Sequence, residues 1–163
     1  MVWLVVAVGF GVLLAIARAS AGPLDDPDPA HQRPGLLDLG ELPVPAPPVS
    51  DGVPTPGREA VVFFVRPAQL PALCGALADA DLAGQPDLVV VVAGSVAPCA
   101  ADAAVLADRG GRLAEAYGLR PPADRGAPVG YAVVDEAGRI RYRTLDPEVD
   151  ELLGEVDTIL RAV

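Results

Sequence analysis

The sequence predicts an α/β domain in which a central mixed β-sheet is flanked by helices. Two continuous apolar runs rich in β-branched residues, 60–65 and 88–93, have the composition of central strands that are covered on both faces. Apolar residues recur at helical spacing after the first run and again near the C-terminus. Two later apolar runs flank the turn sequence 135–138, which predicts an antiparallel hairpin.

The first half of this domain has the order strand, helix, strand. A strand is expected over residues 60–65, followed by a helix in which Leu70, Leu73, Cys74 and Leu77 share one side. This helix is expected to end before Gly84 and Pro86, because those residues terminate helices. The second buried strand then follows over residues 88–93.

The second half is expected to contain a short strand, a helix, the hairpin and a last helix. The short strand covers residues 103–107, and the helix runs from Arg112 to Tyr117 because Gly118 stops it. The hairpin strands are residues 131–134 and 139–144, and an amphipathic helix covers residues 147–160 with Asp146 as its N-cap. This is the element order of a thioredoxin fold.

The N-terminus predicts a transmembrane helix in residues 1–22, placed before the domain. Residues 2–17 are apolar and uncharged, and as a helix they span about 24 Å, so residues 19–24 are needed to approach a hydrocarbon core of about 30 Å. The alternative is a cleaved signal peptide, because Ala19-Ser20-Ala21 has the form of a cleavage site. No basic residue precedes the apolar run, which favours a single-pass anchor in the cell membrane.

The orientation of that anchor stays open at this stage. Arg18 and Arg33 follow the apolar run, which weakly favours a cytoplasmic domain by the positive-inside rule. The resemblance of the N-terminus to a signal sequence favours export instead. We expect an extracytoplasmic domain.

Residues 23–57 predict a Pro-rich linker between the anchor and a domain at residues 58–163. The segment contains Pro43-Val44-Pro45-Ala46-Pro47-Pro48, which favours an extended, polyproline-like spacer. Residues 36–39 and 42–44 offer an alternative, in which a short strand docks on the edge of the sheet.

The composition excludes several function classes. The chain has 22 acidic and 12 basic residues, a net charge of −10, so a nucleic acid is not an expected partner. Its only histidine, His31, lies in the linker, which argues against a histidine-based metal site. Gly94-Ser95 and Gly110-Gly111 lack the flanking pattern of a phosphate-binding loop, so no cofactor is expected.

Residues 103–143 carry a family resemblance. They contain Val-Leu-Ala-Asp, then Leu-Ala-Glu-Ala-Tyr-Gly, and then Ala-Pro-Val-Gly-Tyr-Ala-Val-Val-Asp-Glu-Ala-Gly-Arg-Ile. This segment resembles the second half of membrane-anchored TlpA-type thioredoxins and of the alkyl hydroperoxide reductase and thiol-specific antioxidant (redoxin) superfamily. The resemblance implies a thioredoxin-like fold and a thiol-disulfide oxidoreductase or thiol peroxidase activity.

The active-site half departs from the family patterns. On the thioredoxin pattern, Pro67, Ala68 and Pro71 occupy the Trp-Cys-x-x-Cys positions, so the dithiol is missing. On the peroxiredoxin pattern Pro67, Pro71 and Cys74 have the expected spacing, but Pro71 replaces a threonine of the peroxide site. Pro128 falls near the family's cis-proline position. The resemblance therefore implies a degenerate active site.

Cys74 and Cys99 are the candidate reactive residues. A position near a helix start favours a thiolate at Cys74, whereas its place on the apolar stripe favours a buried structural cysteine. Arg66 directly follows the first strand and can supply positive charge to a thiolate. Cys99 follows the second strand at the same edge of the sheet, so a disulfide with Cys74 is conceivable in an exported domain.

Two function classes remain open on the sequence. In the first, Cys74 attacks a disulfide or peroxide and Cys99 resolves the product. In the second, a catalytically silent module binds a protein partner, through the groove beside Pro128 where family members receive extended peptides. The expected partners are the membrane and a thiol-bearing or peptide protein partner, with no metal.

Overall fold

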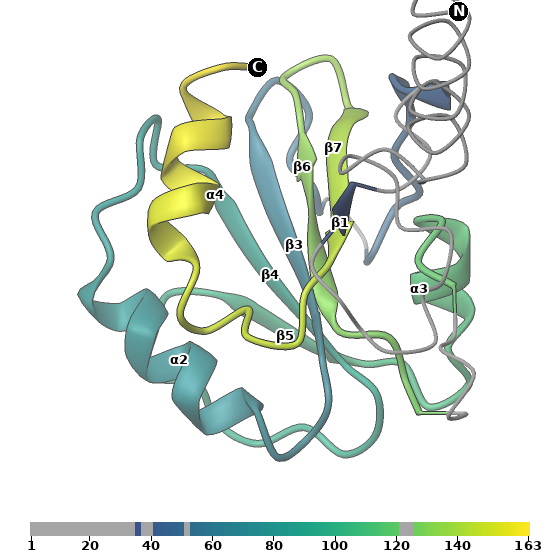
Figure 1. Cartoon of the computed structure of the whole chain (residues 1–163), viewed down its shortest axis with the longest axis vertical. Coiled ribbons are helices and arrows are strands. Elements are labelled where there is room, and N and C mark those ends of the chain that lie inside the picture. Colours follow the sequence, from purple (N-terminus) through teal and green to yellow (C-terminus); the bar gives the residue numbers. More distant parts are fainter. Residues whose placement is uncertain (1–34, 37–40, 51–52, 121–125) are drawn as a thin grey trace, which may run out of the picture.

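The computed structural model describes residues 35–36, 41–50, 53–120 and 126–163. The described chain forms seven strands and three helices in one sheet-centred domain (Figure 1). In chain order the elements are β1 (Gly35–Leu36), β2 (Val44–Pro45), β3 (Ala60–Val65), α2 (Leu70–Asp79), β4 (Asp87–Val92), β5 (Ala104–Ala107), α3 (Arg112–Ala116), β6 (Gly130–Val134), β7 (Arg139–Leu145) and α4 (Leu153–Leu160).

The sheet is mixed, with β3 at its centre. The strand order is β1-β7-β6-β3-β4-β5, and β2 also pairs with β7. Strands β3, β4 and β5 are parallel, whereas β6 is antiparallel to both β3 and β7. Val62, for example, lies between Val89 of β4 and Ala132 of β6. All six residues of β3 are buried, which explains its continuous apolar sequence.

The two faces of the sheet carry separate hydrophobic cores. The α2/α4 core lies under α2 and α4 and contains Phe63, Val90 and Tyr131 from the strands. The α3 core lies on the other face and contains Phe64, Val91 and Tyr117. Figure 1 shows α2 and α4 on one side of the sheet and α3 on the other. Alternate residues of the central strands therefore serve the two cores.

The C-terminal helix begins later than the sequence predicts. Residues 147–151 form turns instead of the first helical residues, and α4 begins only at Leu153. The Asp146 carboxylate accepts a hydrogen bond from the Glu148 N–H at 2.8 Å, so this side chain caps a turn and not the helix. Val149 is fully buried within that turn, which accounts for its apolar character.

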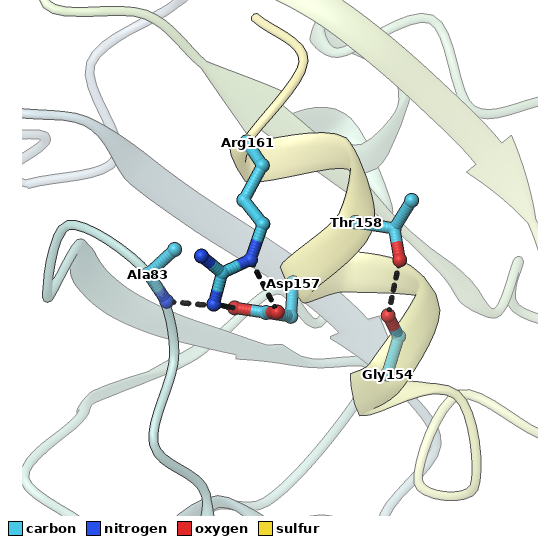
Figure 2. Close-up of polar contacts among 5 residues, drawn as sticks. All are labelled: Ala83, Gly154, Asp157, Thr158 and Arg161. Atoms are coloured by element: carbon cyan, nitrogen blue, oxygen red, sulfur yellow. Dashed lines mark hydrogen bonds and ion pairs between the residues drawn. The ribbon is translucent and has the colours of Figure 1, made fainter.

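Polar contacts join α4 to the segment that follows α2 (Figure 2). The Asp157 carboxylate accepts hydrogen bonds from the Ala83 N–H and from Arg161 Nε, both at 2.8 Å. The hydrogen bond from Arg161, followed by that from Ala83, lowers the pKa of Asp157. The Thr158 hydroxyl donates only to the Gly154 carbonyl within the same helix. Asp157 thus links α4 to the segment after α2, whereas Thr158 forms a hydrogen bond only within α4.

Part of the predicted linker is paired with the sheet. Leu36 lies opposite Thr144, and Val44 lies opposite Ile140, so both short strands extend the sheet beyond β7. The Tyr117 hydroxyl donates to the Pro47 carbonyl at 2.9 Å, which holds the following segment over the α3 core. Leu36 and Val44, which belong to the two segments 36–39 and 42–44 of the docked alternative, are thus paired with the sheet edge.

The predicted fold class included an N-terminal transmembrane helix, and in this respect it is corrected. The helices of the described residues have 10, 5 and 8 residues. A membrane-spanning helix needs about 20 apolar residues, and no helix in the described part of the chain is long and apolar enough to cross a membrane. The predicted anchor at residues 1–22 lies outside the described residues.

Candidate redox site

The candidate site lies at the carboxyl ends of β3 and β4. Because these strands are parallel, their ends at Val65 and Val92 reach the same edge of the sheet. Helix α2 starts from this edge, and the loop at residues 93–103 leaves it towards β5. The backbone N–H of Ala93 donates to the Val65 carbonyl at 2.9 Å, which holds the start of the loop beside the end of β3.

A disulfide between Cys74 and Cys99 joins this loop to α2. The S–S distance is 2.06 Å, the Cα atoms are 5.3 Å apart, and 25 positions separate the residues in sequence. The bridge that the sequence left open is therefore formed. It uses both cysteines of the chain, so no thiol is free in this state.

The two halves of the disulfide have different surroundings. Cys74 is 4% exposed and belongs to the α2/α4 core together with Leu70, Leu73 and Leu77. Cys99 is only partly buried and packs against the edge of that core. Its loop is exposed from Ser95 to Pro98. Cys74 is thus enclosed by apolar side chains, whereas Cys99 is a partly exposed residue at the end of an exposed loop.

Arg66 is directed to the segment before Pro128. Its Nε donates to the Ala127 carbonyl at 3.0 Å, and its backbone N–H donates to Gln69 Oε1 at 3.2 Å. These contacts fix the end of β3 to residues 126–128, which approach the same edge from the other half of the domain. The role of Arg66 in stabilising a thiolate stays a prediction.

Pro128 does not have the cis peptide bond that the resemblance suggested. Within the described residues, the cis bonds precede Pro43 and Pro54. Pro128 lines a small hollow of about 10 Å³ with Phe64, Val91 and other residues. A hollow of that size holds at most about one water molecule, so it is no peptide groove in this conformation. Phe64 and Val91 belong to the α3 core, whereas the disulfide belongs to the α2/α4 core.

Two further residues lie at this edge of the sheet: Gln69, which the sequence does not single out, and Asp146, which the sequence predicts only as an N-cap. Gln69 precedes α2, and its Nε2 donates to the Pro147 carbonyl at 2.8 Å. The Asp146 backbone N–H donates to the Val129 carbonyl, and its side chain is buried at 1% exposure. Burial raises the pKa of Asp146, although the hydrogen bond from Glu148 opposes this shift. An Asp before a Pro is typical of a turn, whereas Gln69 gives no sequence signal.

A second polar cluster lies between the hairpin and α4. The hydroxyls of Tyr131 and Tyr142 both donate to Glu155 Oε1, at 2.6 and 3.0 Å. Their rings are stacked with centroids 5.5 Å apart. Burial is the main cause that raises the pKa of Tyr142 to about 12. At neutral pH both phenols are therefore hydrogen-bond donors that fasten α4 to the sheet.

Among residues 35–36, 41–50, 53–120 and 126–163, no group of three His, Cys, Asp or Glu side chains is placed to hold a metal ion. No protein-family model matches the chain, and a search of curated proteins finds no match. The chemistry that this site offers is that of a disulfide between a buried and a partly exposed cysteine.

Proposed function

We propose that the chain is a thioredoxin-like, redoxin-class thiol-disulfide protein whose redox centre is the Cys74–Cys99 pair. The observation that carries this proposal is the disulfide between α2 and the loop after β4. It lies at the carboxyl edge of the two central parallel strands, where the resembled families keep their reactive cysteines. In place of the missing Cys-x-x-Cys motif, Cys74 and Cys99 form a disulfide between residues that are 25 positions apart.

The reaction is a two-electron exchange with a partner dithiol. A partner thiolate attacks one sulfur, the Cys74–Cys99 bond breaks, and its electron pair goes to the other sulfur, which then takes up a proton. The second partner thiolate attacks the mixed disulfide and releases the remaining cysteine. The partner is oxidised to a disulfide, and Cys74 and Cys99 are reduced to thiols. With a peroxide, the reduced pair is oxidised. One thiolate attacks a peroxide oxygen, the O–O bond breaks, and a sulfenic acid and an alcohol or water are formed. The other thiol then attacks the sulfenic acid sulfur and releases water, which restores the disulfide.

Two features support a working disulfide in an exported domain. Disulfides persist in oxidising compartments, which favours the extracytoplasmic location. Cys99 is partly exposed in the folded domain, and partial exposure is typical of reactive cysteines.

The alternative is a silent thioredoxin-fold module that binds a protein partner, with a purely structural disulfide. The burial of Cys74 among Leu70, Leu73 and Leu77 favours this alternative, because inert cysteines are typically enclosed by apolar residues. Structural disulfides of exported proteins resist reduction and have potentials below about −300 mV. The potential of the pair therefore separates the two functions.

The test is a redox titration of the native full-length protein. The protein is equilibrated in dithiothreitol buffers of graded potential, quenched with acid, alkylated and weighed by mass spectrometry. A redox centre exchanges reversibly at a potential above about −300 mV, in the native state. The protein with both cysteines changed to serine is the control for thiol turnover. Reduction only below that potential, or only in denaturant, would contradict the proposal and leave the silent module.

A further inference from the structure

We infer that Cys99 is the sulfur through which the pair exchanges with its partner, and that this partner is a protein thiol flanked by uncharged, apolar residues. The inference rests on the proposed redox function and adds the point of attack and the chemistry of the partner. The resemblance gave the attacking role to Cys74, whereas the surroundings of the two sulfurs favour the opposite order.

The first argument is access to the sulfur. A thiolate approaches a disulfide along the S–S axis, from the side opposite the sulfur that leaves. Attack on Cys74 would need an approach from the side away from Cys99, where Cys74 is packed in the α2/α4 core and is 4% exposed. Cys99 is partly exposed and follows the exposed residues 95–98, so a partner can approach it from the surface of the domain. Cys74 is therefore the leaving sulfur.

The second argument is the composition of the loop around Cys99. Residues 93–101 contain no charged side chain, in a chain of which 21% is charged. Val96 is 49% exposed, and besides it only Val163 is an exposed large hydrophobic residue in the described part of the chain. A loop without charged side chains and with an exposed valine offers an apolar contact and no ion-pair partner, which favours an apolar partner segment over a charged one.

The third argument is the way in which the loop is held. Between Ser95 and Ala100, no backbone hydrogen bond to another described residue is formed. Gly94 precedes this stretch at φ +153°, and an added Cβ would meet Pro67 Cγ at 3.0 Å. The disulfide is thus the main tie between residues 95–100 and α2. Once it opens, Cys99 can follow a bound partner while Cys74 stays in the helix.

The exchange then has a defined sequence. The partner thiolate forms a bond with Cys99 Sγ, the bond between Cys99 and Cys74 breaks, and the electron pair passes to Cys74, which is protonated. In the mixed disulfide, Cys99 Sγ is bonded to the first sulfur of the partner. The second thiol of the partner attacks that first partner sulfur and releases Cys99 as a thiolate. The partner dithiol loses two electrons, and the Cys74–Cys99 pair gains them.

The point of attack can be mapped on the native oxidised protein with reduced glutathione as the probe. Samples are quenched with acid at early times, and free thiols are then blocked with a maleimide. A protease that cuts before aspartate separates the two cysteines, because Asp79, Asp81 and Asp87 lie between them. We expect glutathione on Cys99 and maleimide on Cys74, with at least about a tenfold excess over the opposite pattern.

Three results have distinct meanings. Glutathione on Cys74 at an equal or higher level overturns the inference and leaves the redox function intact. No mixed disulfide in the native protein, with rapid exchange in denaturant, overturns the redox function and the inference together. The expected pattern supports both.

The partner chemistry is tested with two synthetic peptides, one with a single cysteine between leucines and one with it between aspartates. The leucine peptide should react severalfold faster with the native protein. Val96→Asp should remove most of this advantage, while the same change at the other exposed residue, Val163→Asp, should leave it unchanged. The C-terminus lies at the opposite end of the domain from the start of α2 (Figure 1). Equal exchange rates for the two peptides would contradict the inference that the partner segment is apolar. An equal loss of the rate advantage in Val96→Asp and Val163→Asp would contradict it as well.

Discussion

The two loops that flank β4 are held in different ways. The segment 80–87, which ends at the first residue of β4, is fixed by several polar contacts: Ala83 N–H to Asp157, Asp87 N–H to the Glu59 carbonyl, and Arg58 Nη2 to the Gln85 carbonyl, all at 2.8 Å. The segment 93–103, after the strand, has backbone hydrogen bonds near its ends, but among the described residues none within residues 95–100. There, the disulfide supplies the tie.

This difference separates a loop that is insensitive to redox state from one that depends on it. Loss of one hydrogen bond from the segment 80–87 leaves the others in place. Loss of the Cys74–Cys99 bond removes the main restraint on residues 95–100 at once. Local opening free energies vary along a chain for such reasons, so reduction should act on one loop selectively.

The largest expected effect is that of opening the disulfide. Cys99→Ala should lower the free energy of unfolding by about 3 to 4 kcal/mol, because a cross-link over 25 residues restrains the unfolded chain by roughly that amount. Denaturant unfolding of the oxidised protein and the variant measures the loss. Hydrogen exchange should rise in residues 94–102 and stay unchanged in residues 80–87. An equal rise in both segments would contradict the contrast between the loops.

Gly94→Ala should lower the free energy of unfolding by a smaller amount. Gly94 has φ +153°, a conformation that costs other residues about 1 to 3 kcal/mol, and the new Cβ would lie 3.0 Å from Pro67 Cγ. Gly75→Ala is the matched control, since Gly75 is within α2 and its added Cβ meets no atom within 4 Å. The free energy of unfolding of Gly75→Ala should rise by about 0.5 to 1 kcal/mol. The melting temperatures of the two variants are compared with that of the wild-type protein. If both are lowered, the conformation of Gly94 is not the cause.

The redundantly held loop should respond only weakly to loss of one contact. Asp157→Ala removes the acceptor of Ala83 and Arg161, so the melting temperature at pH 7 should fall by a few degrees and exchange should rise within residues 80–87. Thr158→Ala is the control, because that hydroxyl bonds only within α4 (Figure 2). If the two variants behave alike, the link through Asp157 does not hold the loop.

The effect of Asp157 should also depend on pH in a defined direction. Its pKa is lowered in the folded protein, mainly by Arg161, so its stabilising contribution is complete above the pKa of the unfolded chain, about 3.9. The contribution is lost as the pH falls through the lowered pKa of the folded state. The difference in melting temperature between the wild-type protein and Asp157→Ala should therefore shrink as the pH is lowered below about 3.9, towards the lowered pKa.

The buried strands were the most predictable part of the fold. The runs at 60–65 and 88–93 form β3 and β4 within a residue or so, because strands covered on both faces need continuous apolar sequence. The start of α4 was not predictable from periodicity, since the buried Val149 continues the apolar pattern within a turn. Docking of residues 36–39 and 42–44 on the sheet edge was an alternative that the sequence offered, but the choice of β7 as partner was not predictable, because two-residue strands carry almost no pattern.

The site was predictable only in part, because its contacts are made across the chain. The sequence placed Cys74 and Cys99 at one sheet edge, but whether they are bonded depends on a Cα distance of 5.3 Å that no spacing rule gives. The contact of Arg66 with Ala127, and that of Gln69 with Pro147, join residues more than 60 positions apart. Such contacts follow from the packed fold and not from local sequence.

The smallest effect is expected at Asp146, a second carboxylate near the start of α2. Its pKa is shifted in the opposite direction to that of Asp157. Asp146 is buried beside the turn that Gln69 contacts through Pro147, and burial raises its pKa. A group whose folded pKa is raised stabilises the fold below its unfolded pKa of about 3.9 and loses that contribution as the pH rises through the folded pKa. At neutral pH the ionised Asp146 is therefore destabilising. Asp157 has the opposite dependence.

Asp146→Asn should accordingly raise the melting temperature at pH 7 by roughly 1 to 3 °C, because the amide keeps an acceptor for the Glu148 N–H without a buried charge. The gain should shrink as the pH falls through the raised pKa of Asp146 towards the unfolded value of about 3.9. Glu148→Gln removes the same charge from an exposed side chain nearby and should change the melting temperature less. An equal gain in both variants would mean that relief of the net charge of −10, and not burial, is the cause. A loss in Asp146→Asn at pH 7 would instead show that the ionised carboxylate stabilises the start of α2.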